Sequence, residues 1–336
     1  MKKVTLAHLA QEANVGTATV ERVLNARGNV SLETAERVAI AARKLGYDRR
    51  LPERYRGIIR IEAIMMRPDT PFFARLNQAF AHIAASLDTS IIVHRTFLDE
   101  LDPRRLARHI ACPPFRRSGL IIAAPDHPEV KASLREARAA GAKIVHIVSR
   151  IGNEHDIFVG IDNYAAGRSA AYYMTNMLAD RSGSFLALCH SGVYEVHRER
   201  VRGFSDYLAE RGNPGHRFAL VMFGQDDVLR SAELFEDALS DGRDVIGVYN
   251  AGGAESGIAS VLQRHNREKS IMWIGHELTE NSRRWLQSGL MNIVFDQAPE
   301  IQARRAIDLV LKRIGFIDVE VSTEPVRFLT FNSENI

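Results

Sequence analysis

The sequence predicts an α/β protein in which a small three-helix unit precedes two doubly wound lobes built on parallel sheets. In residues 1–47 the apolar residues recur only at helical spacing. From residue 58 onward, near-continuous apolar segments alternate with amphipathic ones, and such segments are typical of parallel strands covered on both faces. About a dozen strands are too many for one small sheet, so we expect two lobes.

Composition limits the class of protein. The chain has 336 residues, of which 46% are hydrophobic and 25% charged, and this excludes a disordered or fibrous protein. Polar residues interrupt every apolar run that could form a signal peptide or a membrane span. Cys112 and Cys189 lie far apart, without metal-ligand spacing. We therefore expect a cytoplasmic protein with reduced cysteines, no metal, no cofactor and no membrane partner.

Basic charge is concentrated at the N-terminus. Residues 1–56 hold 11 Lys and Arg against 6 Asp and Glu, whereas the rest of the chain holds 33 against 35. An excess of this kind is the electrostatic footprint that binding to nucleic-acid phosphates requires. Charge alone raises the expectation of nucleic-acid binding only modestly, because basic faces are often simply solvated.

The first 47 residues predict three short helices around a small apolar core. Thr5 can cap the first helix, and "NVG" ends it, with Gly16 free to take a backbone conformation closed to other residues. A second helix begins near Thr17, and a third, "LETAERVAIAARKLG", is capped by Ser31 or its neighbour and ends at Gly46. The core would come from Leu6, Leu9, Ala10, Ala13, Val20, Val23, Leu24, Val38, Ala41, Ala42 and Leu45. Two helices joined by a tight turn and followed by a third match a helix-turn-helix unit.

These residues carry a resemblance to a known family. "VTLAHLAQEANVGTATVERVLN" followed by "VSLETAERVAIAARKLGY" resembles the DNA-binding headpiece of the lactose-repressor (LacI/GalR) family. The resemblance implies a two-fold homodimer on a pseudo-palindromic operator, with the second helix of each headpiece in the major groove. It places Thr17, Ala18 and Arg22 at base edges, and it places Thr5, Thr19 and Asn25 on phosphates or at the backbone margin.

Residue chemistry supports Arg22 as the main reader of bases. Its planar fork can bond both major-groove acceptors of a guanine, which Lys cannot do. Thr17 and Ala18 are small and could contact a thymine methyl group. Glu21 stands where the family usually has a small hydroxyl residue. It could accept from a cytosine amino group, or it could pair with Arg22 or Arg27, and both alternatives stay open.

The segment "DRRLPERYRG", residues 48–57, predicts a linker because it is basic and contains a proline and a glycine. In the family this segment places a leucine wedge in the minor groove. Here Arg56 stands at the leucine position, so the wedge is in doubt. Arg54 and Arg56 could instead reach into a narrow minor groove, which concentrates negative potential.

Residues 58–336 are expected to form the two-lobed domain, with the chain crossing between lobes near residues 161, 296 and 324. Helices are predicted over residues 71–87, 102–111 and 127–140. Further helices are predicted after the later strands, and those after the last two strands begin near residues 279 and 298. The predicted strands are "IIRIEAIMM", "SIIVHRTF", "SGLIIAA", "KIVHIVS", "IFVGID", "SFLALCH", "RFALVMF", "DVIGVYN", "SIMWIG" and "MNIVF". Ligands of such sheets bind at the carboxyl ends of the strands, here the crevice between the lobes.

Residues 58–331 resemble the periplasmic sugar-binding-protein fold that this family carries behind its headpiece. That resemblance implies that Phe72 and Phe73 stack on a sugar face. It also implies that sugar hydroxyls bond to Arg150, Arg200, Asn250, Glu277 and Gln297. The set is chemically sensible, because hydroxyls donate and accept together and therefore need a fork donor, a pure acceptor and amides.

The ligand class stays open at this point. Arg150 and Arg200 against Glu277 leave one positive charge in excess. The candidate ligands are therefore a sugar acid or sugar phosphate and, as an alternative, a neutral sugar or polyol. A purine or nucleoside corepressor is an alternative. An enzyme is not expected, since no phosphate-binding loop is present, "NAGGAESG" lacks dinucleotide spacing and "HELTE" lacks a second zinc-binding histidine. We expect a ligand-responsive transcriptional regulator, most simply a repressor, rather than a solute-binding protein with no DNA role.

Overall fold

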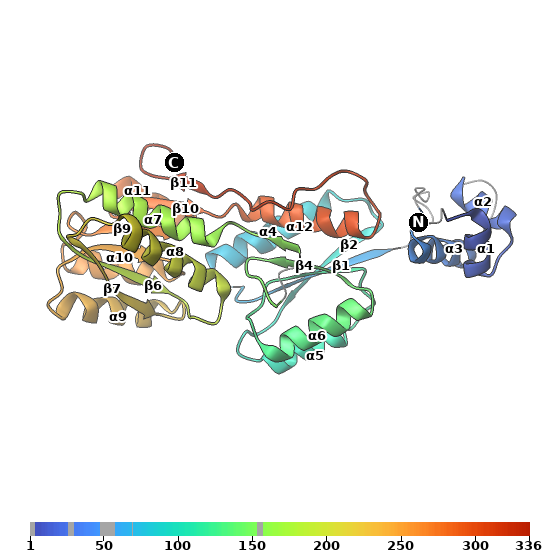
Figure 1. Cartoon of the computed structure of the whole chain (residues 1–336), viewed down its shortest axis with the longest axis horizontal. Helices are drawn as coiled ribbons and strands as arrows, with labels where there is room; N and C mark the ends of the chain where they lie inside the picture. Colours follow the sequence, from blue (N-terminus) through green and yellow to red (C-terminus); the bar gives the residue numbers. More distant parts are fainter. Residues whose placement is uncertain (1–3, 26–29, 48–57, 69, 153–156) are drawn as a thin grey trace.

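A computed structural model of the chain describes residues 4–25, 30–47, 58–68, 70–152 and 157–336 (Figure 1). The predicted linker 48–57, with Arg54 and Arg56, lies outside the described residues, as does Arg27. The described ranges contain no helix with both the length and the apolar character needed to cross a bilayer.

The N-terminal headpiece consists of α1 (Leu6–Ala13), α2 (Thr17–Leu24) and α3 (Leu32–Leu45). The prediction of three helices is confirmed. Thr5 caps α1 by accepting from the His8 backbone N–H at 3.4 Å, and Ser31 accepts from the Thr34 N–H at 3.2 Å at the start of α3. The helices bury Leu9, Ala10, Ala13, Val20, Val23, Leu24, Ala35, Val38, Ala41 and Ala42 against one another.

The expectation for Gly16 was wrong. Gly16 is the N-cap of α2 with an ordinary extended conformation, φ −74° and ψ 153°. The left-handed residue of this turn is Asn14, the C-cap of α1, with φ 50° and ψ 53°. Asparagine is one of the few residues with a Cβ that tolerates this conformation, so the turn places its strained residue at Asn14 and leaves Gly16 unstrained.

Lobe 1 is a five-stranded parallel sheet with two helices on each face. Its strands are β1 (Ile59–Met65), β2 (Ile91–Phe97), β3 (Gly119–Ile122), β4 (Lys143–Ile147) and β5 (Ile157–Val159), in the order β2-β1-β3-β4-β5. One face packs on α4 (Pro71–Ala85) and α12 (Pro299–Arg313). The other face packs on α5 (Pro103–Ala111) and α6 (Pro128–Ala139).

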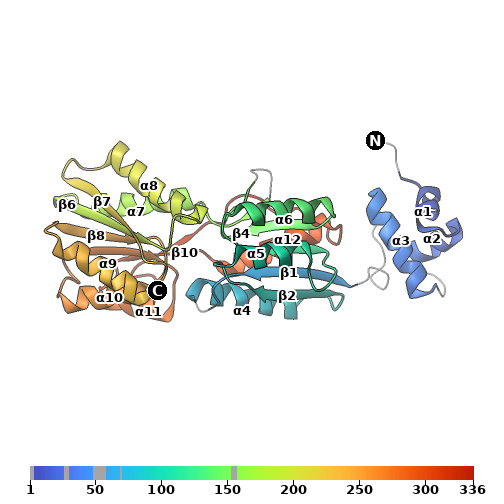
Figure 2. The same ribbon diagram turned by 90° about the horizontal axis from the view of Figure 1, so that it is seen from below.

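Lobe 2 is a six-stranded sheet in the order β11-β10-β9-β8-β6-β7 (Figure 2). Its strands are β6 (Gly183–Cys189), β7 (His216–Phe223), β8 (Val245–Asn250), β9 (Met272–His276), β10 (Ile293–Asp296) and β11 (Leu329–Phe331). One face packs on α7 (Asn163–Met177) and α8 (Glu195–Arg211). The other packs on α9 (Val228–Ser240), α10 (Glu255–Arg264) and α11 (Glu280–Ser288).

The sequence analysis missed β11, which pairs antiparallel with β10. Three residues are too few to show a strand period, so this edge strand depends on the presence of β10. The doubly wound α/β class is otherwise confirmed. The chain passes from one sheet to the other after β5, after β10 and before β11, and Ile161 forms an isolated bridge with Val326 between the crossing segments.

Two glycines set the spacing of α7 and α8. A Cβ at Gly167 would lie 2.0 Å from the Arg200 carbonyl oxygen, and a Cβ at Gly203 would lie 2.1 Å from the Tyr164 carbonyl oxygen. Only glycine permits this approach of the two backbones. The contact fixes α8, and therefore Arg200, against α7.

Candidate functional site

The exposed side of α2 carries the residues expected at DNA. Val20, Val23 and Leu24 turn into the headpiece core. Thr5, Thr17, Ala18, Glu21, Arg22 and Asn25 are exposed, and Thr19 is half-buried. The eight-residue helix therefore presents one continuous polar face. Thr5 also serves as the α1 cap, so its hydroxyl has a structural role in the free protein.

Neither Glu21 nor Arg22 forms an ion pair within the described part of the chain. Arg27 is not described, so pairing of Glu21 with Arg27 stays a hypothesis. Since Arg22 is exposed and has no described carboxylate partner, its guanidinium can meet a base edge without first breaking an ion pair.

A buried hydrogen-bond network centred on Arg200 joins the crossing segments. Arg200 is 3% exposed. Its guanidinium donates to Asn163 Oδ1 at 2.9 Å, to the Ala251 carbonyl at 2.8 Å and to Gln297 Oε1 at 2.6 Å. Burial lowers the pKa of Arg200 below its ordinary value. All three bonds are to neutral acceptors, so the positive charge is solvated by amide oxygens and not neutralised by a bonded carboxylate.

Glu277 extends this network to lobe 1. Its Oε1 accepts from Gln297 Nε2 at 2.5 Å, and its Oε2 lies 3.0 Å from Nη1 of Arg75 on α4. Arg75 also reaches Asp296 at 2.5 Å. Burial, with the Asp296 charge next in importance, raises the pKa of Glu277 to about 8. Burial thus favours the protonated form of Glu277. Arg75 is shared by Glu277, Asp296 and Glu300, whose two carboxylate oxygens each lie 3.1 Å from its Nη2.

A second cluster bridges the two lobes. Arg67, which follows β1, donates to Asp226 Oδ2 at 2.6 Å, and Asp226 follows β7. Glu100, which follows β2, lies 3.4 Å from Arg67 Nε and accepts from Tyr194 and from His190 Nε2, the latter at 3.1 Å. Burial acts to raise the pKa of Asp226, but Arg67 and the Gly253 N–H hold it below its ordinary value. The lobes are thus held together by ionised pairs.

The other predicted ligand residues lie in different surroundings. Phe72 is buried and Phe73 half-buried at the start of α4, with ring centroids 5.4 Å apart, and both pack on the lobe 1 core. Asn250 is fully buried and donates to the Gly253 carbonyl at 3.0 Å, which shapes the turn after β8. The structure brings Arg200, Gln297 and Glu277 together, while Asn250 supports the adjacent loop.

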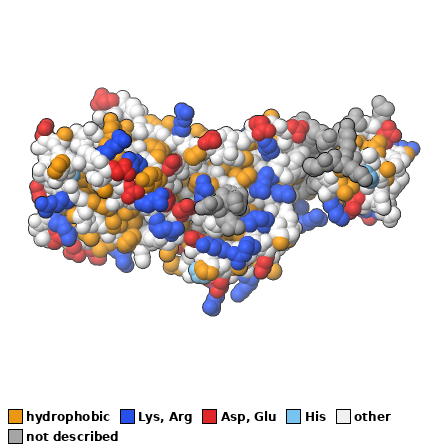
Figure 3. Space-filling view, viewed as in Figure 1, with side chains coloured by type: hydrophobic (Ala, Val, Ile, Leu, Met, Phe, Trp, Pro, Cys, Tyr) orange, Lys and Arg blue, Asp and Glu red, His pale blue; other side chains and the backbone are white. Residues whose placement is uncertain are grey.

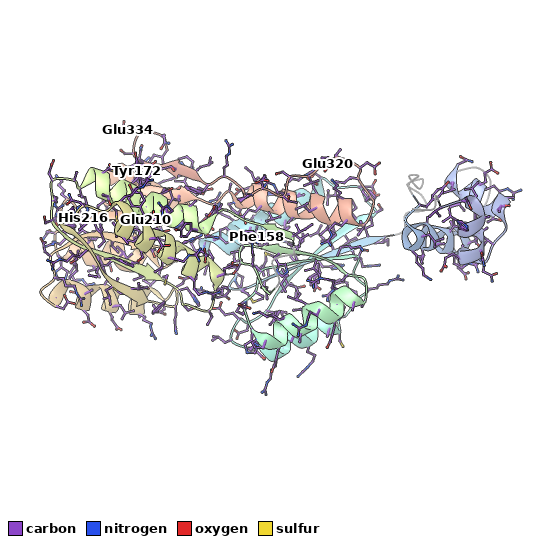
Figure 4. The ribbon with its side chains drawn as sticks, in the orientation of Figure 1. Phe158, Tyr172, Glu210, His216, Glu320 and Glu334 are labelled. Atoms are coloured by element: carbon purple, nitrogen blue, oxygen red, sulfur yellow. The ribbon has the colours of Figure 1, made fainter. Side chains whose placement is uncertain are left out.

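Arg150 does not join the network. It is exposed, and its guanidinium lies over the ring of Phe158, 5.0 Å from the centroid. Figure 4 labels Phe158 in lobe 1. The backbone N–H of Arg150 donates to Glu195 at 3.1 Å across the lobes. Arg150 as a ligand residue therefore stays a prediction that the described contacts do not support.

The described lobe interface holds more carboxyl groups than the sequence count for the proposed ligand site included. Sequence reasoning counted two arginines against Glu277 alone. The structure places three arginines among five carboxyl groups there: Arg67, Arg75 and Arg200 with Glu100, Asp226, Glu277, Asp296 and Glu300. Carboxyl groups therefore outnumber arginines in this set, so it gives no support for an anionic ligand.

Most of the residues that sequence reasoning missed had a usable signal. Arg67, Asn163, Glu100, Asp226 and Asp296 all lie at or within a few residues of the carboxyl end of a strand, where ligand-binding side chains of α/β sheets gather. Their importance was hidden because nothing in the sequence states which strand ends face each other. Arg75 had no such signal, since it lies one turn into α4.

Comparison with protein families gives two matches. Residues 5–50 match the model described as bacterial regulatory proteins, lacI family. Residues 117–315 match the model described as a periplasmic binding protein domain.

Two curated relatives are HTH-type transcriptional regulators named MalR. The one from Streptomyces coelicolor is 28% identical over 209 residues, covering 59% of this chain and 57% of that protein. The one from Staphylococcus xylosus is 25% identical over 218 residues, covering 60% of each. The matched part of the chain thus spans less than two thirds of the length of these relatives.

Solved structures share the fold of the two lobes. GanP, a glucose-galactose binding protein from Geobacillus stearothermophilus, is 19% identical with a TM-score of 0.72, covering 83% of this chain and 99% of that one. A solute binding protein from Agrobacterium vitis, bound with alpha-D-tagatopyranose, is 17% identical with a TM-score of 0.72, covering 82% and 95%. At these identities the likeness concerns the fold alone.

Proposed function

The chain belongs to the lacI family of bacterial regulatory proteins, and we propose that it is a DNA-binding transcriptional regulator whose operator affinity is set by a small molecule held between its two lobes. The observation that carries the proposal is the exposed polar face of α2, with Arg22 unpaired among the described residues, within a headpiece that matches the family. The family and the two relatives are regulators, which agrees with the expectation that the chain is not an enzyme.

The DNA half of the proposal is tested at Arg22. We expect Arg22→Ala to weaken binding to the selected operator by about 1 to 3 kcal/mol and to relax specificity at one base pair. Binding to random duplexes should change little, because phosphate contacts supply that component. Operator selection from a random pool, followed by titration of both variants, measures this. Equal losses on operator and random DNA would place Arg22 on phosphate.

For the effector we propose a neutral sugar or polyol. The support is the lack of a positive excess among the described charged groups at the lobe interface and the set of amide, guanidinium and carboxyl groups around Gln297, which can donate to and accept from hydroxyls. Structural neighbours named for glucose-galactose and tagatose binding add to it. A purine or nucleoside corepressor is the second candidate, because Phe72 and Phe73 could stack on a base.

Effector binding is expected to require the lobes to separate first. The guanidinium of Arg200 donates to Asn163, Ala251 and Gln297 in the described structure, so a ligand must replace protein acceptors. It must also displace the cross-lobe pairs of Arg67 and Arg75. We propose that opening and ligand-bound closure change the spacing of paired headpieces, which shifts the population fit for the operator.

Arg200→Ala tests the proposed effector site. Since Arg200 would supply charge-assisted bonds to ligand hydroxyls, we expect a loss of at least about 2 kcal/mol in effector affinity, with DNA binding retained. The probe is whichever of a panel of pentoses, hexoses, polyols and nucleobases raises the melting temperature, followed by calorimetric titration. Unchanged affinity for that probe would remove Arg200 from the site.

We further propose a homodimer that uses the free edge of lobe 2. Strand β7 is the edge strand, and beside it lies a groove of about 500 Å³ lined by apolar residues of β7 and α9 together with Arg230, Asp237, Asp241 and Arg243. Phe223 and Leu229 are 47% and 75% exposed at this edge. Leu229→Asp should shift the protein toward monomer in sedimentation equilibrium and weaken operator binding. Leu101→Asp, at an 84% exposed site in lobe 1, is the control and should leave the dimer intact.

Repression is the proposed outcome of operator binding, since a dimer held across a promoter excludes other proteins from it. A reporter gene placed behind the selected operator tests whether the protein lowers or raises expression. Higher expression with the protein than without it would make the protein an activator.

A further inference from the structure

The two lobes carry opposite net charge. Residues 58–160, which form most of lobe 1, hold 14 Lys and Arg against 11 Asp and Glu, whereas residues 161–298 hold 14 against 18. The excess in lobe 1 is strongest in residues 101–145, with 9 against 4. Figure 3 shows Lys and Arg side chains gathered over lobe 1, while both signs are mixed over lobe 2.

Part of this charge lies at the base of lobe 1, the edge of the sheet opposite the lobe interface. All five strands run parallel from this edge, and β1 starts at Ile59, just after the linker that follows the headpiece. We call four cations here the basal cluster. They are Arg60 in β1, Arg108 in the last turn of α5, Arg116 before β3 and Lys143 at the start of β4.

A neighbouring arginine, Arg117, is paired with a carboxylate, whereas these four cations are not paired with one among the described residues. Arg117 has a side chain only 4% exposed, and it donates to Glu62 at 2.8 Å and to the Ile110 carbonyl. Ser118 donates through its backbone to the Arg60 carbonyl at 2.7 Å. The loop that carries Arg116 is therefore anchored on both sides, so Arg116 is presented from a fixed backbone.

None of the four basal cations forms an ion pair in the part of the chain that the structure describes. Arg108 and Arg116 are exposed, whereas Arg60 and Lys143 are half-buried. Two acidic groups near this end have partners of their own: Asp88 accepts from Ser90, and Glu320, labelled in Figure 4, pairs with Lys312. The basal cluster thus places cations without a described ion pair at the end of lobe 1 where the chain arrives from the headpiece.

Stabilisation of helix ends does not account for the cluster. A cation in the last turn of a helix stabilises the helix dipole, and this explains Arg108. Arg60 and Lys143 are strand residues and Arg116 lies in a loop, so none of them serves a helix end.

We propose that the basal cluster is a second DNA-contacting surface, which binds phosphates flanking the headpiece site without reading sequence. This inference rests on the proposed DNA binding by the headpiece. The ten residues 48–57 span at most about 35 Å when fully extended. A headpiece on DNA therefore holds the basal cluster close to the same duplex, at a high effective concentration. Exposed cations with no internal carboxylate lose little on meeting phosphate and release counterions from it.

The test is the salt dependence of DNA binding by the full-length chain. Arg108→Ala/Arg116→Ala should make the slope of log K against log salt shallower by about 0.9 for each phosphate that is no longer neutralised, about 2 per subunit. Arg108→Lys/Arg116→Lys should keep the wild-type slope, because binding a phosphate needs charge and not a planar fork. Fluorescence anisotropy on a random duplex of about 40 base pairs, between about 50 and 200 mM salt, measures it.

The matched control is Arg211→Ala/Arg283→Ala, two exposed lobe 2 arginines without a described ion pair, and it should leave the slope unchanged. On a duplex of about 20 base pairs, which covers little beyond two half-sites, the difference between wild type and Arg108→Ala/Arg116→Ala should shrink. Equal slopes for those two proteins on the long duplex would overturn the second surface and leave the headpiece proposal standing. Absence of DNA binding by wild type would overturn both.

Discussion

Lobe 1 and lobe 2 are built on the same alternation of strand and helix, yet they differ in where they place charged side chains and in how their helices pack. Lobe 1 buries the carboxylate of Glu62 inside its own sheet and carries an excess of cations, whereas lobe 2 packs two helices through glycines, buries Glu277 and Asp296 at the lobe interface and carries an excess of acids. The alternation fixes the architecture of each lobe. The side chains at the ends of the strands and helices decide which lobe can bind a polyanion. The two lobes therefore share a fold but are expected to have different partners.

The buried carboxylate of lobe 1 is Glu62, which is fully buried in the middle of β1. It accepts from Thr96 at 2.8 Å, His109 at 2.7 Å and Arg117 at 2.8 Å. Burial acts to raise the pKa of Glu62, but these three partners together hold it below its ordinary value. Its contribution to stability is therefore present above that ordinary value, 4.5, and is lost as the pH falls through the lower pKa of the folded protein.

Removing this carboxylate should have the largest effect. Glu62→Ala leaves Arg117 buried without its carboxylate, which typically costs about 3 to 5 kcal/mol. Urea unfolding at neutral pH measures it. Glu62→Ala/Arg117→Met, which removes both charges, should recover part of the loss. A cost below about 1 kcal/mol for the single variant would show that the cluster does not stabilise lobe 1.

The corresponding prediction for lobe 2 is that Gly203→Ala destabilises it. The added methyl group would collide with the Tyr164 carbonyl, and separating α7 from α8 should cost about 1 to 3 kcal/mol. Because α8 carries Arg200, effector affinity should fall as well. Gly192→Ala, with no atom within 4 Å of the added carbon, serves as control. Thermal unfolding and effector titration of both variants test this, and equal behaviour of the two would mean that the helices separate without cost.

Replacing Glu277 is expected to have a smaller effect on stability, and this effect is a gain. Its pKa of about 8 in the folded protein lies above the ordinary 4.5, so the folded protein keeps a proton that the unfolded chain releases between these pH values. The contribution of Glu277 to stability is therefore greatest below pH 4.5 and falls as the pH rises to 8. Glu277→Gln, a neutral isostere, should flatten this dependence and gain at least about 1 kcal/mol at pH 8 relative to pH 5.

Melting temperatures of wild type and Glu277→Gln at pH 5, 6.5 and 8 measure the difference. Asp296→Asn is the comparison, since Asp296 pairs with Arg75 at 2.5 Å, and loss of this pair should destabilise the protein at every one of these pH values. A gain from Glu277→Gln that did not grow with pH would show that Glu277 is already ionised in the folded protein.

Local sequence was sufficient to define the elements and the kind of chemistry. The spacing of Val20, Val23 and Leu24 defined α2 and left Arg22 on its outer face, because a helix of fixed period can bury only one stripe. Near-continuous apolar strands indicated the doubly wound lobes, and the position of Arg200 after a strand placed it among the ligand residues. These inferences work because they depend on neighbours close in the chain.

Which charges meet depends on the folded arrangement of the lobes. Arg67 and Asp226 are 159 residues apart in the chain, and no local pattern states that they pair or that Glu277 shares Arg75 with Asp296. The same is true of Asn14 in place of Gly16, and of β11, which exists because β10 offers an edge. Pairing energies and pKa values depend on distance and burial in three dimensions, so the charge balance of the lobe interface could not be counted from sequence order.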